Sequence, residues 1–178
     1  DGNIMLSNSG LYLNSNQSGG VIEIDLDNQN LINIFNSNNT SSIGGLDGIY
    51  NPTWDSNYAV VSQIVEKNGI VYVVNPYNEL YGKIISYYNT TTGQWSGLDV
   101  SGQSLYLPNE IAFDHNGQIW IAFDRENDLS GSDLYSSGGV RYVNSNNQLV
   151  EPGNSSEIVG GANIDVLSLD ICRYNGFD

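Results

Sequence analysis

Residues 109–123 read NEIAFDHNGQIWIAF and decide the fold of this chain. Two β-rich runs, 109–115 and 118–123, flank the pair Asn116-Gly117. An Asn-Gly pair between such runs is the strongest short-range signal for a β-hairpin, because a two-residue type I′ turn needs a positive φ at both central residues. The stretch therefore predicts two antiparallel strands joined by a tight turn.

The same hairpin pattern recurs along the chain. Asx-Gly pairs also occur at Asp1-Gly2, Asn68-Gly69 and Asn175-Gly176. Each of the first three hairpins is followed by a third β-rich run, a short polar turn and a fourth run. The third runs correspond to one another at 19–25, 82–88 and 138–143, and the fourth runs at 31–35, 95–98 and 148–151. Four antiparallel strands per unit, with no helical periodicity, predict an all-β chain built from the blades of a β-propeller.

The predicted strands amount to about three four-stranded antiparallel blades, an open arc of a larger propeller. We expect a single partial domain, with blades at 1–57, 58–108 and 109–162 and the start of a next blade at 163–178. Closed propellers have about four to eight blades. The chain is therefore expected to be cut from a longer protein whose remaining blades complete the ring, with assembly of several copies as the alternative. Open strand edges also predict that the chain associates with itself.

Charge and composition exclude several partners. The 178 residues include 20 Asp and Glu against 5 Lys and Arg, for a net charge of −15. Nucleic acid requires cations that neutralise phosphates, and an anionic membrane surface repels such a chain. No apolar run approaches the roughly 20 residues that span a bilayer, so no direct membrane insertion is expected. One histidine and one cysteine are too few for a Cys₂His₂ or Cys₄ zinc site.

A family resemblance rests on the third unit. Residues 108–122, PNEIAFDHNGQIWIA, followed by 138–142, GGVRY, resemble the two-component-regulator propeller repeat. They are also similar to the surface propellers associated with bacterial type IX secretion, the PorZ-like group. All three units share the layout, but Tyr72 and Met5 stand where the third unit has Trp120. The resemblance implies a periplasmic, secreted or cell-surface propeller that senses, binds or scaffolds without catalysis of its own.

The predicted connections alternate between tight turns on one face and long loops on the other. Long loops on a rigid scaffold are where binding residues usually lie. Rigid aromatic rings among short amides suit sugar rings or peptide backbones. The candidate ligand-binding residues are the aromatic residues of these loops: Tyr12, Tyr50, Trp54, Tyr77, Tyr81, Tyr106 and Tyr135. The alternative is that these rings pack under their own loops.

An acidic loop in the third unit suggests a cation site. Asp124, Glu126 and Asp128 alternate along it and could converge on one Ca²⁺, which takes six to eight oxygen ligands. An EF-hand-like loop counted from Asp124 would have Gly sixth and Glu twelfth, where this chain has Leu129 and Tyr135. A solvated insertion is the alternative, and no other cofactor is expected.

No pattern marks a catalytic centre, so the chain is not expected to be an enzyme. Glycoside chemistry needs two carboxyl groups about 5 to 9.5 Å apart. The loop acids to test first for such a pair are Asp47, Asp55, Asp124 and Glu126. His115 lies beside a hairpin turn and is expected to be solvated, and Cys172 to be a small buried hydrophobe.

Residues and resemblance together predict a non-catalytic binding or scaffolding module of a bacterial extracytoplasmic protein. It would contact a peptide, protein or glycan through its long-loop face. One alternative is the extracytoplasmic sensor propeller of a receptor kinase, which flanking sequence would reveal. Another is a calcium-dependent protein that binds or acts on polysaccharide, which binding tests with and without EDTA would reveal.

Overall fold

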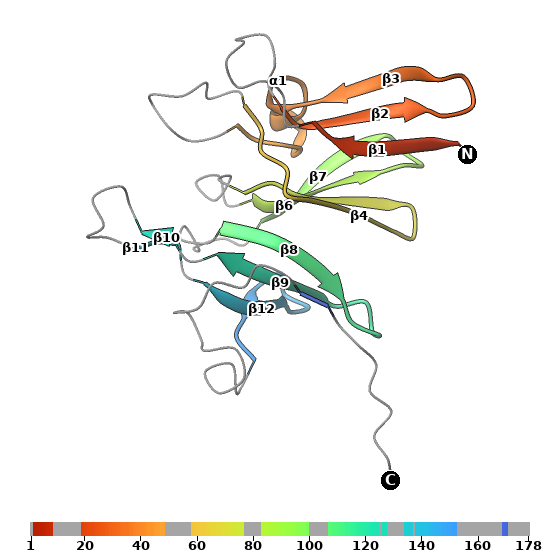
Figure 1. Cartoon of the computed structure of the whole chain (residues 1–178). Coiled ribbons are helices and arrows are strands. Elements are labelled where there is room, and N and C mark those ends of the chain that lie inside the picture. The colour runs from red at the N-terminus through yellow and green to blue at the C-terminus, as the bar shows by residue number, and fades with distance from the viewer. Residues whose placement is uncertain are drawn as a thin grey trace. The chain divides into compact units, whose positions relative to one another are not determined.

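The chain is all-β in its computed structural model (Figure 1). The structure describes residues 2–8, 19–48, 58–76, 83–99, 107–124, 126–127, 134–136, 138–152 and 169–170, with the backbone alone at 99, 126–127 and 134–136. The chain divides into two compact units, Asp1–Ser104 and Leu105–Asp178. Within the described residues, no helix is long and apolar enough to cross a membrane.

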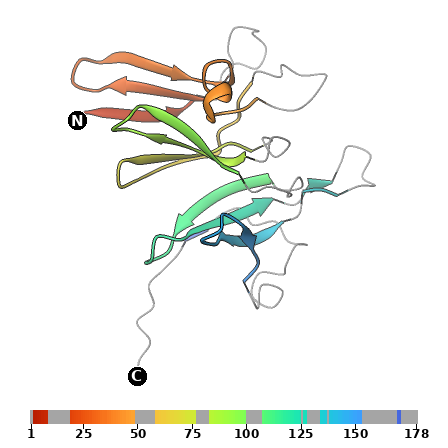
Figure 2. The ribbon, with the colours of Figure 1, turned by 180° about the vertical axis from the view of Figure 1, so that it is seen from behind.

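The first unit contains two antiparallel sheets. The first sheet has the strand order β1-β2-β3, and the second sheet has the order β4-β5-β6-β7. The strands are β1 (Asn3–Ser7), β2 (Val21–Asp25), β3 (Asn30–Phe35), β4 (Gln63–Lys67), β5 (Ile70–Val74), β6 (Lys83–Asn89) and β7 (Gln94–Asp99). Strands adjacent in sequence are paired, as the repeated hairpins predict. The tight turns of both sheets lie at one end of the unit, as Figures 1 and 2 show from opposite sides.

The second unit contains the third sheet, with the strand order β13-β12-β9-β8. Its strands are β8 (Leu107–Phe113), β9 (Ile119–Asp124), β12 (Gly139–Val143) and β13 (Leu149–Val150). A separate hairpin of β10 (Glu126–Asn127) and β11 (Leu134–Ser136) lies between β9 and β12 in sequence. The sequence predicted a long connection there, and part of that connection forms this hairpin.

An Asx side chain shapes one turn in each of the three sheets. Asp25 and Asn89 are the last residues of β2 and β6, and an oxygen of each accepts the backbone N–H groups two and three residues ahead. Asn144 follows β12 and accepts those two and four residues ahead, as Asp114 does in its own turn. Each turn closes on a residue with positive φ: Gln29 (54°), Gly93 (68°) and Asn147 (57°). Short Asx side chains suit this position because they bond to backbone groups two residues ahead. Much of the abundant Asn therefore shapes turns.

The two Asn-Gly hairpins that the structure describes differ in their turns. Asn68 (φ 55°) and Gly69 (φ 78°) both have positive φ, as the predicted type I′ turn requires. At the second hairpin only Gly117 (φ 84°) does, so the prediction of a type I′ turn was wrong there. Asp114 accepts N–H groups of Asn116 (2.8 Å) and Gln118 (2.9 Å), which stabilises a wider turn.

The core of the first unit lies between its two sheets. The buried residues are Val21, Leu46, Ala59, Val71, Val73 and Trp95, with Met5, Phe35, Val61, Ile64 and Tyr88 packed against them. The rings of Phe35, Tyr88 and Trp95 have centroids 5.1 to 5.3 Å apart. Apolar burial stabilises a fold by roughly 25 cal/mol per Å², so this face-to-face contact holds the two sheets together.

Strand pairing shows that the three sheets repeat in register. The same cross-strand position is occupied by Met5–Glu23, Tyr72–Tyr87 and Trp120–Tyr142. The alignment of 19–25 with 82–88 matched Glu23 with Ser86, and it was wrong by one residue in the second sheet. A register shift between Lys83 and Ile85 accounts for the extra residue.

One turn of helix was not expected. Helix α1 (Ser37–Thr40) and the 3-10 helix η1 (Ser41–Ile43) begin the connection after β3. Asn36 caps α1 by accepting the N–H of Asn38 (3.0 Å), and the side chain of Asn39 accepts the N–H of Asn36 (2.9 Å). A single turn shows no 3.6-residue periodicity, so hydrophobic pattern could not reveal it.

Two predicted features lie outside the described residues. These are the hairpin at Asn175-Gly176 and, except for residues 169–170, the strand expected at 163–173. The N–H of Leu169 donates to Oε2 of Glu110 on β8 (2.7 Å). The part of the predicted strand that is described therefore contacts the first strand of the third sheet.

Replacing Asp25 with asparagine should remove part of the acid sensitivity of the first unit. Hydrogen bonds from the side chain and then the backbone of Asn28, with a further one from the N–H of Asp27, lower the pKa of Asp25. A lowered pKa contributes stability above the unfolded value near 3.8, which is lost as pH falls through the folded value. Asn89 accepts the corresponding backbone N–H groups as an amide, but an amide at position 25 has no second oxygen to accept Nδ2 of Asn28, so Asp25→Asn should lower Tm slightly at neutral pH.

Thermal unfolding of both proteins from neutral pH to below pH 3 measures this. The Tm of Asp25→Asn should fall less steeply than that of the wild type across the acid range. Parallel Tm curves would show that the carboxylate of Asp25 contributes nothing beyond what an amide provides.

Candidate functional site

The predicted ligand-binding aromatics are almost entirely outside the described residues. Tyr12, Tyr50, Trp54, Tyr77, Tyr81 and Tyr106 all lie there. Tyr135 lies in β11, where the structure describes the backbone alone. The described residues instead show how the connections that carry Tyr50, Trp54, Tyr77 and Tyr81 are held at their ends.

The predicted cation ligands are only partly described. Asp124 ends β9 and Glu126 begins β10, while Asp128 and the side chain of Glu126 lie outside the described residues. In the part of the chain that the structure describes, no three His, Cys, Asp or Glu side chains gather as metal ligands. The Ca²⁺ site therefore remains a prediction.

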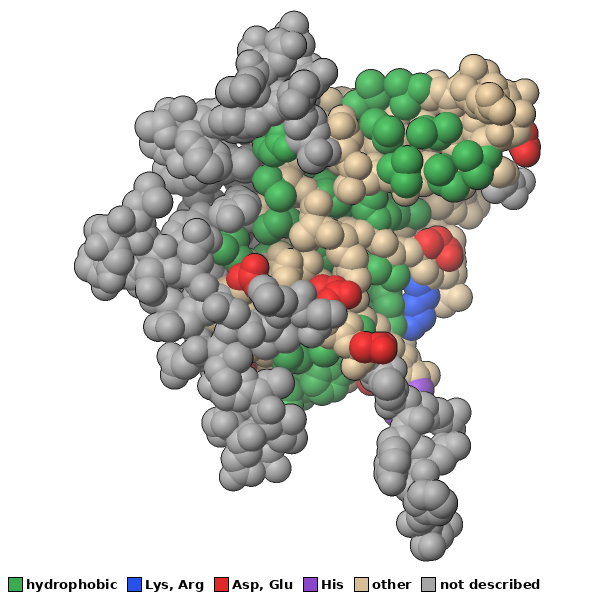
Figure 3. Space-filling model, viewed as in Figure 1, with side chains coloured by type: hydrophobic (Ala, Val, Ile, Leu, Met, Phe, Trp, Pro, Cys, Tyr) green, Lys and Arg blue, Asp and Glu red, His purple; other side chains and the backbone are tan. Residues whose placement is uncertain are grey.

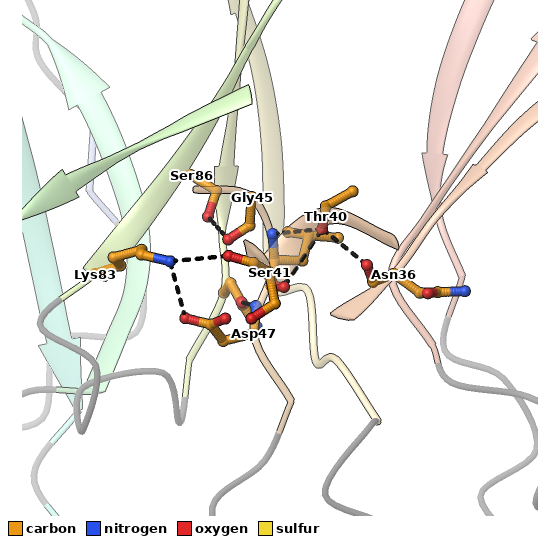
Figure 4. A network of polar contacts seen from close by, with 9 residues as sticks. Asn36, Thr40, Ser41, Gly45, Asp47, Lys83 and Ser86 are labelled. Carbon is orange, nitrogen blue, oxygen red and sulfur yellow. Dashed lines mark hydrogen bonds and ion pairs between the residues drawn. The ribbon is translucent and has the colours of Figure 1, made fainter. Parts of the chain in front are cut away.

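A polar network lies where the long connections of the first unit meet the second sheet (Figure 4). The backbone N–H of Asp47 donates to Oδ1 of Asn75 (2.9 Å), and Nδ2 of Asn75 donates to the carbonyl of Val60 (2.7 Å). Asp47 and Asn75 are 3% and 1% exposed. Three segments distant in sequence are thus joined through one buried amide.

The carboxylate of Asp47 is paired with Lys83, the first residue of β6. The Lys83 Nζ lies 3.4 Å from Oδ2 of Asp47 and 3.5 Å from the carbonyl of Ser41 (Figure 4). The Lys83 side chain remains 23% exposed while the Asp47 side chain is almost enclosed. Burying a charge is costly unless it is paired, so Lys83 makes the buried position of Asp47 tolerable.

Threonine and serine hydroxyls extend the network along the same connection. Thr40 Oγ1 accepts the N–H of Leu46 (2.8 Å) and donates to the carbonyl of Asn36 (2.8 Å). Ser86 Oγ on β6 donates to the carbonyl of Gly45 (3.0 Å). Residues 36–47 are therefore fastened both to themselves and to the second sheet.

The hydrogen bonds and the ion pair of this network hold the ends of two long connections, 49–57 and 77–82. Asp47 lies two residues before 49–57, which carries Tyr50 and Trp54. Asn75 and Lys83 lie on either side of 77–82, which carries Tyr77 and Tyr81. We call Asp47, Asn75 and Lys83 the loop-root cluster. It brings the ends of two candidate binding loops to one place.

No protein-family model and no curated protein matches this chain.

A second buried charge lies in the third sheet. Arg141 on β12 is 3% exposed; its NH2 nitrogen donates to Oε1 of Glu151 (2.9 Å) and its NH1 nitrogen donates to the carbonyl of Gly138 (2.9 Å). The guanidinium also lies 5.4 Å from the ring centre of Phe123. Gly138 ends the connection that carries the acidic loop, so Arg141 fastens that connection as the loop-root cluster fastens the other two.

Sequence reasoning placed some of these residues correctly and missed others. Asp47 was a candidate loop acid, and the structure pairs its carboxylate with Lys83. His115 is exposed at its turn, as expected, whereas Asp55 and Cys172 lie outside the described residues. Asn75 was missed, because among 25 asparagines nothing in the sequence distinguishes a buried one.

Proposed function

We propose that the chain is part of a β-propeller that serves as a non-catalytic binding or scaffolding module of a bacterial secreted or cell-envelope protein. It contacts a peptide, protein or glycan through the face formed by its long connections. The extracytoplasmic location is supported by the resemblance of residues 108–122 to propeller repeats of the bacterial envelope.

Three features support the propeller. Three antiparallel meanders share one register, an Asx side chain shapes a turn in each, and two of them stack face to face. Each apolar sheet needs such a neighbour on its faces, which radial repetition of blades provides. The connections of the first unit also alternate, since the turns at 26–29, 68–69 and 90–93 are short and those at 8–20, 36–62 and 75–82 are long.

The observation that carries the binding role is the loop-root cluster. Asp47, Asn75 and Lys83 hold the ends of two connections whose sequences contain four aromatic residues. Binding gains affinity when the contacting groups are held in place beforehand, because less conformational entropy is lost on association. Buried hydrogen bonds at the ends of loops that carry aromatic and amide residues are more typical of a binding surface than of loops that only join two strands.

The experiment is a binding screen followed by aromatic substitution. The full chain would be tested on glycan and peptide arrays, with and without EDTA, and bound ligands measured by titration calorimetry. Trp54→Ala and Tyr77→Ala should each raise Kd at least about tenfold, because large aromatics dominate binding energy at interfaces. His115→Ala, at an exposed position on a tight turn, is the matched control and should leave Kd unchanged.

Three results would contradict the proposal. The first is a chain that binds nothing on either array, and the second is an affinity that Trp54→Ala and Tyr77→Ala leave unaltered. Loss of all binding on addition of EDTA would instead favour the calcium-dependent polysaccharide alternative.

A further inference from the structure

The first sheet has three strands, whereas the second and third sheets have four. Strand β1 forms one edge of the first sheet, next to β2 (Figure 1). In strand register β1 corresponds to β5 and β9, because Met5 occupies the position of Tyr72 and Trp120. Those two strands lie inside their sheets, where β4 and β8 pair with them. Among the residues that the structure describes, no strand pairs with the same edge of β1.

The hydrogen bonds at the two ends of β1 show which of its residues face that edge. In an antiparallel pair, successive residues direct their backbone N–H and C=O groups alternately toward the partner and away from it. The N–H of Asn8 donates to the carbonyl of Gly20 (2.8 Å) on one side of β2, and the N–H of Leu26 donates to the carbonyl of Gly2 (2.8 Å) on the other. The even-numbered residues of β1 therefore bond to β2. The residues whose backbone groups point the other way are Asn3, Met5 and Ser7.

The same alternation in the other sheets shows what takes this position. In the second sheet, the N–H of Thr90 donates to the carbonyl of Gly69 (3.0 Å), so Gly69 bonds toward β6 and Tyr72 bonds toward β4. In the third sheet, the carbonyl of Gln118 accepts the N–H of the residue that follows β8 (3.0 Å), so Trp120 bonds toward β8. At the position that is open in β1, both strands are thus bonded to the strand that directly precedes them in the chain.

Gly2 lies where a turn from such a strand would end. The carbonyl of Gly2 accepts the N–H of the residue after β2, and the carbonyl of Gly69 accepts the N–H of the residue after β6. These two glycines therefore occupy the same place in strand register. Since Gly69 is the second residue of the tight turn between β4 and β5, a strand on the edge of β1 needs only one such turn to join it.

The side of the first sheet that faces away from the second sheet, its rear face, is a second and independent observation. It consists of Ile4, Leu6, Ile22, Ile24, Leu31 and Ile34. Leu31 and Ile34 are 56% and 46% exposed, and hydrophobic side chains gather over this sheet at the upper right of Figure 3. In register, Leu6 matches Val73 and Leu31 matches Trp95, which the first sheet covers. In the second sheet this side is thus covered by the sheet before it, so the rear face too indicates further protein on the N-terminal side of β1.

We propose that a strand encoded directly before Asp1 pairs antiparallel with the edge of β1 and completes a four-stranded first sheet. It exchanges backbone hydrogen bonds with Asn3, Met5 and Ser7. An edge strand with unpaired N–H and C=O groups is a template for a further strand, and the repeat assigns that place to the preceding segment. The inference rests on the sheet repeat of the proposed propeller and is independent of its ligand.

The two strands that fill this place in the other sheets indicate the chemistry of the segment. Ile64 of β4 lies opposite Val73, and Ile111 of β8 lies opposite Ile121. Val73 and Ile121 are the residues that match Leu6, which is 43% exposed. Because directly opposite residues share a face and touch, we expect an aliphatic residue opposite Leu6 in the preceding strand.

Hydrogen exchange of the chain with and without an added strand tests the proposal. In the chain alone, the N–H groups of Asn3, Met5 and Ser7 should exchange at least about tenfold faster than those of their even-numbered neighbours, which bond to β2. One extended protein carries the residues that its own reading frame encodes before Asp1. In both this protein and the one described next, exchange of the three N–H groups should slow at least about tenfold.

The second extended protein carries a copy of residues 59–67 fused directly before Asp1. This spacing sets Val65 of the copy opposite Met5, as Val65 itself lies opposite Tyr72. The matched control is the same fusion with Val65→Pro in the copy, because proline has no N–H to donate to β1. The control should leave the three N–H groups as fast as in the unextended chain, and circular dichroism checks that each protein is folded.

Three results would overturn the proposal. Slow exchange of the three N–H groups in the unextended chain would mean that the edge is already paired, and a dependence on protein concentration would assign the partner to a second copy. Protection by the fused copy but not by the natural extension would mean that the edge takes its strand from another source. Fast exchange in both extended proteins would mean that the edge takes no strand. Failure of ligand binding leaves these rates unchanged, so the two proposals fail separately.

Discussion

Replacing Lys83 with methionine should destabilise the first unit by about 3 kcal/mol, because Asp47 would keep a buried carboxylate without its cation. The Asp47 side chain is 3% exposed and its Oδ2 lies 3.4 Å from the Lys83 Nζ. Removing one partner of a buried pair costs about 3 to 5 kcal/mol, and the lower end applies because Lys83 is 23% exposed and partly hydrated. Urea unfolding of the full chain, followed by tryptophan fluorescence, measures the loss.

A double-mutant cycle separates the ion pair from the packing of the lysine stem. Lys83→Met combined with Asp47→Leu should be less destabilised than the sum of the single variants, with a coupling of about 1 to 3 kcal/mol. Lys83→Arg retains the charge and should lose less than Lys83→Met. Additive single and double variants would mean that the two side chains do not stabilise each other and that Asn75 holds the loop roots alone.

The hairpins could be predicted because their signals are local. Asn68-Gly69 adopts the expected turn with both φ values positive, and the side chain of Glu66, two residues before it, accepts the N–H of Gly69 (2.7 Å). At Asn116-Gly117 the side chain of Asp114 accepts two backbone N–H groups and stabilises another turn. The same dipeptide therefore yields two turns, and the difference lies two residues before it.

The unpredicted elements are those held by distant residues. The turn of α1 contains two asparagines, which are poor helix formers in a helix interior. Thr40 and Leu46 fasten it to a chain that folds back six residues later, and Ser86 on β6 holds Gly45 from 41 residues away. Local pattern carries no information on either contact.

The contacts of the loop-root cluster could not be predicted from the sequence. The alternation of short and long connections identifies the end of the sheets where loops gather. Asp47 and Lys83 are 36 residues apart in sequence, and only the stacking of one sheet on the next brings their connections together. The sequence therefore presents Asp47 as a loop acid and Lys83 as a strand residue, and it does not predict their pairing.

Replacing Gly20 with alanine should strongly destabilise the first sheet, with a loss of about 2 to 5 kcal/mol. Gly20 has φ +96°, and its carbonyl and N–H bond to Asn8 (2.8 Å) and Ala59 (3.0 Å). An added Cβ would overlap the carbonyl oxygen of Phe35. Left-handed strain of about 1 to 2 kcal/mol then adds to an overpacking cost of typically 1 to 3 kcal/mol, because backbone on three sides cannot move aside separately.

Gly69→Ala is the control that separates strain from overlap. Gly69 also has a positive φ, +78°, but a Cβ there would meet only Thr90 Oγ1 at 3.6 Å, an ordinary contact. It should therefore lose only the strain of about 1 to 2 kcal/mol. Equal losses in Gly20→Ala and Gly69→Ala, measured by urea unfolding, would mean that the backbone around Gly20 relaxes to admit a side chain. A much larger loss at Gly20 would mean that the junction of β1, β2, β3 and Ala59 admits only glycine. The third sheet also has a glycine at the matching position, Gly139, with φ +93°.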